Sequence, residues 1–164
     1  MINKQRLNKL QEYIESHLNN ETFTYTVESQ IDLEYTLQSE SMTIELEDYI
    51  KNHRKPTLNQ VLFKFIDNAG ASDVEVYRKA GIDRKLFSKI RSNPDYRPGK
   101  NTTIALALAL QLNARDTDAL LSSAGYSLSD SNIFDLVIQF HVENNIHDLY
   151  LVNEALDYFT QKTL

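Results

Sequence analysis

The chain has 164 residues, 41% of them hydrophobic and 24% charged, a composition typical of one globular domain with or without an additional arm. It contains no cysteine, which excludes disulfides, thiolate metal sites and a cysteine nucleophile. No apolar run approaches the ~18 residues of a membrane span, and no secretory signal pattern follows Met1. We therefore expect a cytoplasmic protein without a membrane segment.

The first 40 residues predict an N-terminal helix followed by an arm. Residues 2–18 carry leucine and isoleucine at the three-to-four spacing of an amphipathic helix. Between residues 23 and 37 apolar side chains alternate with polar ones, which favours a short β-hairpin turning near residues 28–30. The same residues also fit a helix, so both alternatives stay open for the arm.

From Ser41 onward the pattern is helical, and the fold class we expect is mainly α. A five-helix core at residues 41–126 should be followed by a C-terminal helical pair at residues 127–164, either packed on the core or used for dimerisation. The first expected helix ends near His53, and the next three run from a Thr57 cap to Gly70, from a Ser72 cap to Ala80 and from an Asp83 cap to Ser92. Three further helices are expected to start at Asn101 or Thr102, at Asp116, and at Ser129 or Asp130. The last expected helix follows the Asn144-Asn145 turn. The run from Ile104 to Leu110 is apolar all round, which predicts a buried central helix.

Positive charge is concentrated in one window of an acidic protein. Residues 78–100 contain eight lysines and arginines and two aspartates, so this window carries +6 while the whole chain carries −6. A local basic face can hold a polyanion even when the molecule as a whole is acidic. The segregation of charge therefore favours nucleic acid as a partner.

The same window has the pattern of two short helices around a tight turn. Gly81 supplies the turn, and Leu86, Phe87 and Ile90 are spaced to face inward from the second helix. Arg84, Lys85, Ser88, Lys89 and Arg91 are then left on the outer side. A helix presenting such residues can lie in a major groove of DNA.

Ala80-Gly81-Ile82-Asp83 and Phe87-Ser88-Lys89-Ile90 resemble the turn and the recognition helix of the lambda-repressor-like helix-turn-helix family. The resemblance covers about residues 57–126. Three positions depart from the family's pattern: Tyr77 stands where a small alanine is usual, Asp73 where a phosphate-contacting glutamine is frequent, and Arg91 where a glutamate is frequent. The first two departures weaken the expectation of DNA contact, and Arg91 strengthens it.

The resemblance implies a transcriptional regulator that binds double-stranded DNA as a homodimer. The expected DNA-binding residues lie on the helix at residues 83–92, in the loop after it and at the start of the next helix, where backbone N–H groups favour phosphate. They are Arg84, Lys85, Ser88, Lys89, Arg91, Arg97, Lys100, Asn101 and Thr102.

We expect neither catalysis nor a cofactor. The sequence contains no nucleophile elbow, no phosphate-binding glycine loop and no metal-ligand spacing among its four histidines. The alternative function is that of a protein-interaction or adaptor module that keeps the helix-turn-helix fold and no longer binds DNA. Asp73, Glu75 and Tyr77 favour this alternative, and the basic window opposes it.

Overall fold

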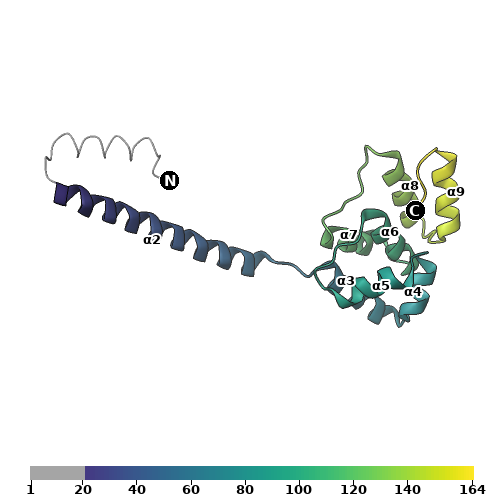
Figure 1. The fold of residues 1–164 in the computed structure, drawn as a ribbon. Helices are drawn as coiled ribbons and strands as arrows, with labels where there is room; N and C mark the ends of the chain where they lie inside the picture. Colours follow the sequence, from purple (N-terminus) through teal and green to yellow (C-terminus); the bar gives the residue numbers. More distant parts are fainter. Residues whose placement is uncertain (1–20) are drawn as a thin grey trace. The chain divides into compact units, whose positions relative to one another are not determined.

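The computed structural model describes residues 21–164, and every element of regular structure in this range is an α-helix. The chain divides into two compact units, Met1–Arg54 and Lys55–Leu164. Figure 1 shows the helices of each unit. The amphipathic helix predicted at residues 2–18 lies outside the described residues.

The arm contains one continuous helix, α2 (Glu21–His53). Of the two alternatives for residues 23–37 the helix is confirmed and the β-hairpin is wrong. The predicted turn at residues 28–30 contains no glycine, asparagine or aspartate, the residues that most readily adopt the backbone conformation of a tight hairpin turn. Threonine, which favours strands, is accommodated because the hydroxyls of Thr36 and Thr43 donate to carbonyls four residues earlier, at 2.7 and 2.8 Å.

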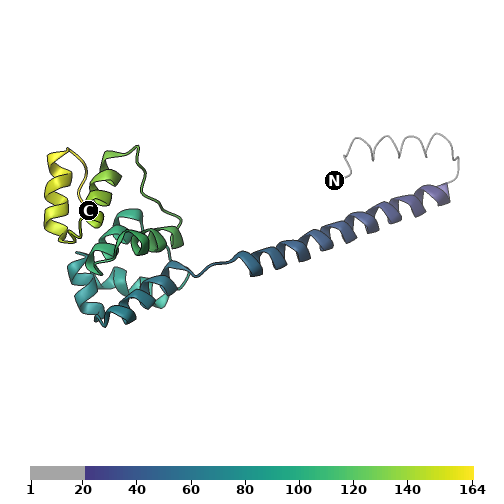
Figure 2. The same ribbon diagram turned by 180° about the vertical axis from the view of Figure 1, so that it is seen from behind.

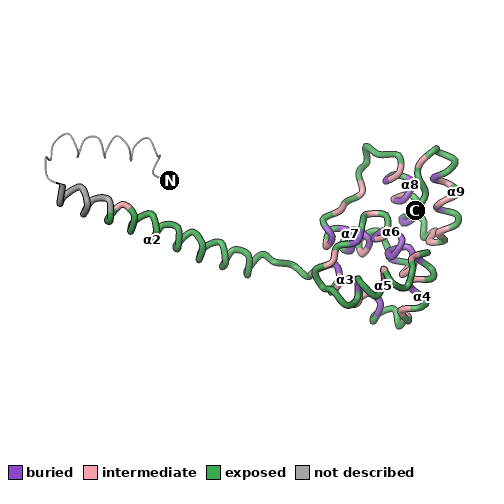
Figure 3. Tube along the Cα trace, viewed as in Figure 1, coloured by how far each residue is buried: buried purple, intermediate pink, exposed green. Residues whose placement is uncertain are grey.

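The side chains of α2 from residue 32 to residue 53 are all exposed (Figure 3). Residues 41–53, which were predicted to belong to the core, form the end of α2 in the first unit. Apolar residues lie on two opposite sides of this helix: Tyr35, Met42, Leu46 and Tyr49 on one, and Leu33, Leu37 and Ile44 on the other.

The second unit consists of seven helices whose starts follow local capping signals. Thr57, Ser72 and Asp83 cap α3, α4 and α5 as predicted, each accepting a hydrogen bond from the backbone N–H three residues later. Later starts differ from the prediction: α7 is capped by Asn113 and α8 by Asn132, and α6 follows Gly99. The helices are α3 (Leu58–Ala69), α4 (Asp73–Lys79), α5 (Arg84–Ser92), α6 (Lys100–Ala109), α7 (Ala114–Ser123), α8 (Ile133–Glu143) and α9 (Leu149–Tyr158).

The core of this unit lies on both sides of α6, which confirms the predicted buried helix. Five consecutive residues, from Ile104 to Leu108, are buried. Ala105, Leu106 and Ala107 belong to a cluster shared with α3, α4, α5 and α7. Ile104 and Leu108 belong to a second cluster that is completed by α7, α8 and α9. Figures 1 and 2 show α6 and α7 between α3–α5 at one end of the unit and α8–α9 at the other.

The C-terminal pair α8–α9 is therefore part of the core. Val137 and Ile138 of α8 and Val152 and Leu156 of α9 are buried in the second cluster. The loop between the two helices is also anchored, because the ring Nε2 of His147 lies 3.0 Å from the carbonyl oxygen of Leu112. No helix in the described range is both long enough and apolar enough to span a membrane.

Candidate functional site

The connection between α4 and α5 is tight and is held by backbone geometry. Gly81 adopts the left-handed conformation, with φ of 66°, which a residue with a side chain adopts only at a cost. The N–H of Ile82 donates to the carbonyl of Tyr77 at 3.1 Å, which closes the end of α4. Asp83 then starts α5, and its carboxylate accepts from the N–H of Leu86 at 2.7 Å.

The inner face of α5 is fixed by apolar packing. Phe87 and Ile90 are buried, at 3% and 0% exposure. The ring of Phe87 meets Phe63 of α3 edge-on at 6.0 Å between centroids, and it packs against Tyr77 of α4 at 5.8 Å. Tyr77, which stands where the repressor-like pattern has a small alanine, therefore has a structural role. Its ring packs against Phe87 of α5, the helix that carries the basic residues.

The outer face of α5 is polar and exposed. Arg84, Lys85, Ser88, Lys89 and Arg91 are all exposed, in agreement with the register predicted from the sequence. Within residues 21–164, neither Arg84 nor Lys85 forms an ion pair. Their charges are therefore available to a ligand.

Arg91 is held in place by two residues from other helices. Its guanidinium forms an ion pair with Asp73 in the first turn of α4 and lies 3.9 Å from the centroid of the Phe63 ring. The side-chain amide of Asn59 donates to the carbonyl of Ile90 at 2.6 Å, which ties α3 to the end of α5. Because Asp73 is the partner of Arg91, the two charged departures from the family pattern compensate each other.

Two cations, Lys89 at the end of α5 and Arg97 in the loop after it, each lie over a tyrosine ring. The ammonium of Lys89 lies 4.3 Å from the centroid of the Tyr96 ring, and the guanidinium of Arg97 lies 5.1 Å from that of Tyr126. The hydroxyl of Tyr126 donates to the carbonyl of Pro98 at 2.9 Å. Lys89 and Arg97 stay exposed, so the aromatic rings orient these charges without removing them from solvent.

Lys100, one of the predicted DNA-binding residues, forms an ion pair within the protein. Its ammonium donates to the buried carboxylate of Asp135 in α8 at 2.8 Å, and the N–H of Ser129 donates to the same oxygen at 2.9 Å. Asn101 is exposed and Thr102 is half-buried. The structure thus directs Lys100 toward α8, whereas Asn101 remains at the exposed start of α6.

The ion pairs of Arg91 with Asp73 and of Lys100 with Asp135 lower the net positive charge of the basic window. Adding the carboxylates of Asp73 and Asp135 to the +6 of residues 78–100 leaves +4. Both ion pairs join residues far apart in the sequence, so no local pattern could have revealed them.

Glu75, the other acidic residue of α4, completes a capping box with Ser72. The Ser72 backbone N–H, and then its hydroxyl, donate to the carboxylate and lower the pKa of Glu75 below its usual 4.5. Since the folded state has the lower pKa, this cap contributes stability above pH 4.5, and the contribution is lost as the pH falls through the lowered pKa. Glu75 is thus a charged residue with a structural role.

Together these features define an exposed basic surface on α5 and the loop after it, and all regular structure within residues 21–164 is helical. In the part of the chain described by the structure, no group of histidine and acidic side chains is arranged to hold a metal ion. Comparisons of the chain with family models, with curated proteins and with solved structures found no match.

Proposed function

We propose that α4 and α5 form a helix-turn-helix of the lambda-repressor type and that α5 binds the major groove of double-stranded DNA. On this proposal the protein is a transcriptional regulator. The observation that carries the proposal is the division of α5 into two faces. Phe87 and Ile90 are buried on one face, while Arg84, Lys85, Ser88 and Lys89 are exposed on the other.

The proposed contacts fall into two groups. Arg84, Lys85 and Ser88 occupy the first turns of α5, the part of a recognition helix that faces base edges. Lys89, Arg97 and the exposed start of α6 at Asn101 flank this helix and would bind phosphates. Bases would then provide the sequence preference, and phosphates most of the affinity.

A salt titration of binding to duplex DNA tests the proposal. Residues 78–100 together with the carboxylates of Asp73 and Asp135 carry a net charge of +4. At most about four phosphates are therefore neutralised, and the log–log slope of affinity against salt is no steeper than about −3.6. The measurement is fluorescence anisotropy of labelled mixed-sequence duplexes between low and physiological salt. No binding at low salt, or a slope near zero, would contradict DNA binding.

A double variant locates the binding surface. Replacing Arg84 and Lys89 with alanine removes one proposed base contact and one proposed phosphate contact. We expect the log–log slope to become shallower by about 0.9, for the lost phosphate contact of Lys89, with at least a tenfold loss of affinity at low salt. The matched control replaces Lys64 and Arg115, which are exposed on α3 and α7. Equal losses in both variants would mean that binding depends on net charge alone, and thermal melting of both variants checks that the fold is intact.

A second candidate function is a protein-interaction module without DNA binding. The observation that favours it is the charged carboxylate of Glu75, which stays exposed in the first turn of α4 and would repel a phosphate backbone. An absence of DNA binding, combined with an intact helical spectrum, would select this candidate.

A further inference from the structure

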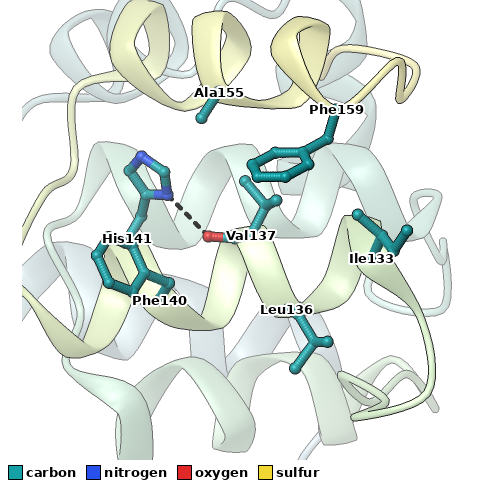
Figure 4. Close-up of a pocket in the computed structure, with 7 residues that line it drawn as sticks. All are labelled: Ile133, Leu136, Val137, Phe140, His141, Ala155 and Phe159. Carbon is teal, nitrogen blue, oxygen red and sulfur yellow. Dashed lines mark hydrogen bonds between the residues drawn. The ribbon is translucent and has the colours of Figure 1, made fainter.

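Two hollows in the second unit differ in their chemistry. The groove between α8 and α9 is lined by apolar side chains and by His141, whose Nδ1 lies 2.7 Å from the carbonyl oxygen of Val137 (Figure 4). The other hollow, which we call the polar pocket, has a volume of about 400 Å³, within the range of small-molecule sites. Its lining includes Lys79 at the end of α4, Leu108 and Ala109 at the end of α6, and His147, Asp148 and Leu149 around the start of α9.

Two side chains of opposite formal charge, Lys79 and Asp148, line the polar pocket without pairing. Within residues 21–164 neither of them forms a salt bridge. Glu75, four residues before Lys79 in α4, senses its charge, but the Glu75 carboxylate accepts its hydrogen bonds from Ser72. Asp148 caps α9 through Oδ1, and in the described part of the chain its Oδ2 accepts no hydrogen bond. Each charge is therefore available to a ligand in the pocket.

Two further features of the polar pocket favour a donor cation beside the carboxylate of Asp148. The ring Nε2 of His147 donates to the carbonyl oxygen of Leu112 at 3.0 Å, which leaves Nδ1 of the neutral ring as an acceptor. Ala109 is the last residue of α6, and the C-terminal end of a helix carries partial negative charge. An ammonium group suits this side of the pocket, whereas the ammonium of Lys79 suits a carboxylate.

Apolar residues complete the lining of the polar pocket. Leu108 is buried, and Ala109 and Leu149 are half-buried. A short aliphatic group of a ligand can lie against these three side chains and be removed from water.

We propose that the polar pocket binds a small zwitterion, a free amino acid with an aliphatic side chain. Lys79 binds the carboxylate of this ligand, and Asp148 and His147 bind its ammonium group. The apolar residues of the lining contact its side chain. Because one charge of the protein meets each charge of the ligand, a molecule with only one of the two charges leaves either Lys79 or Asp148 without a partner.

Thermal melting of the full chain with L-leucine, L-isoleucine, L-valine or L-methionine tests the proposal. A ligand at about ten times its dissociation constant raises the melting temperature of a domain of this size by roughly 4 °C. We expect such a shift with at least one of these amino acids at about 10 mM. Two matched compounds each lack one charge of leucine: isopentylamine lacks the carboxylate, and isocaproate lacks the ammonium group. Neither should shift the melting temperature by more than about 1 °C at the same concentration.

Two variants locate the binding site. Lys79→Gln and Asp148→Asn each remove one charge, and asparagine preserves the cap of α9 because it caps helices as well as aspartate does. We expect at least about tenfold weaker binding in each, measured as a shift of only about 1 °C over the same variant without ligand. The matched controls are Lys64→Gln and Asp67→Asn, which alter exposed residues of α3 outside the pocket and should keep the wild-type shift.

Three outcomes would overturn the proposal: no shift with any of the amino acids, an equal shift with isopentylamine or isocaproate, or unchanged binding in either pocket variant. Titration calorimetry checks that one molecule binds per chain. The measurements are made without DNA, so a failure of the proposed function leaves their outcome unaffected.

Discussion

Asp73 and Arg91, two residues that the repressor-like pattern does not predict at their positions, form an ion pair with each other. Each of them, considered alone, departs from the repressor-like pattern from which DNA binding was predicted. In the structure they bind each other, and Arg91 also lies on the ring of Phe63. Because both side chains are partly exposed, the pair stabilises the fold by at most about 1 kcal/mol. Its larger effect is electrostatic, since it neutralises one cation beside the basic face of α5.

Replacing Asp73 with asparagine should therefore strengthen DNA binding. The substitution frees the charge of Arg91, and we expect a three- to tenfold gain in affinity at low salt with a log–log slope steeper by about 0.9, as for one more phosphate contact. The free energy of unfolding should change by less than about 1 kcal/mol. Anisotropy titrations and thermal melting measure the two effects. Weaker binding by the variant would instead show that Asp73 holds Arg91 in a productive position.

At the scale of the helices, the helix starts that the sequence predicted correctly are the ones marked by a capping residue close by in the sequence. Thr57, Ser72 and Asp83 were identifiable as caps because a short polar side chain satisfies N–H groups only three residues away. The arm was ambiguous for a physical reason. Its apolar residues lie on two opposite sides of α2, so neither the helical nor the strand period dominates, and no packing partner was visible to decide between them.

The candidate site was predictable in part. The exposed face of α5 followed from its inward residues Phe87 and Ile90, which local spacing reveals. The salt bridge of Lys100 with Asp135 could not be predicted, because 35 positions separate the two residues and only the packing of α8 brings them together. Lys100 was accordingly assigned to phosphate binding, although its charge is paired within the protein.

The turn between α4 and α5 should respond to substitution very differently from the start of α6. Gly81→Ser places a side chain at φ 66° and a Cβ 3.2 Å from Leu149 Cδ2, so we expect a loss of about 1–2 kcal/mol in the free energy of unfolding. Gly99→Ser is the matched control, since φ there is −66° and no atom lies within 4 Å of the added Cβ. Serine at this N-cap should be neutral or stabilising by a few tenths of a kcal/mol.

Urea denaturation of both variants measures these changes. Equal stabilities would show that the α4–α5 connection tolerates a residue with a side chain at its turn. A large loss in Gly99→Ser would instead mean that the start of α6 is more constrained than its backbone geometry indicates.

At the scale of the molecule, the two apolar clusters of the second unit are joined through α6 and α7. Leu120 of α7 lies in one cluster and its neighbour Leu121 in the other. Gly81, in the turn before α5, lies next to Leu149 of α9. The C-terminal pair therefore contributes to the same cooperative unit as the basic helix.

Truncation should reveal this dependence. A chain that ends at Tyr126 leaves Ile104, Leu108 and Leu121 without α8 and α9, and we expect it to lose its cooperative thermal transition. The fragment 55–164, which keeps the whole compact unit, should melt within a few degrees of the full chain. Circular dichroism at several wavelengths follows both. A shortened chain that melted cooperatively at the wild-type temperature would show that α3–α7 fold independently.

The burial of α6 on two sides also bears on how this protein can evolve. Between Ile104 and Leu108 no position is exposed, so a change at any of them must be matched by changes in a neighbouring helix. In α5, by contrast, Arg84, Lys85, Ser88 and Lys89 make no contribution to the buried core. Selection can therefore alter the outer face of α5, and with it the choice of ligand, while the sequence of α6 drifts slowly.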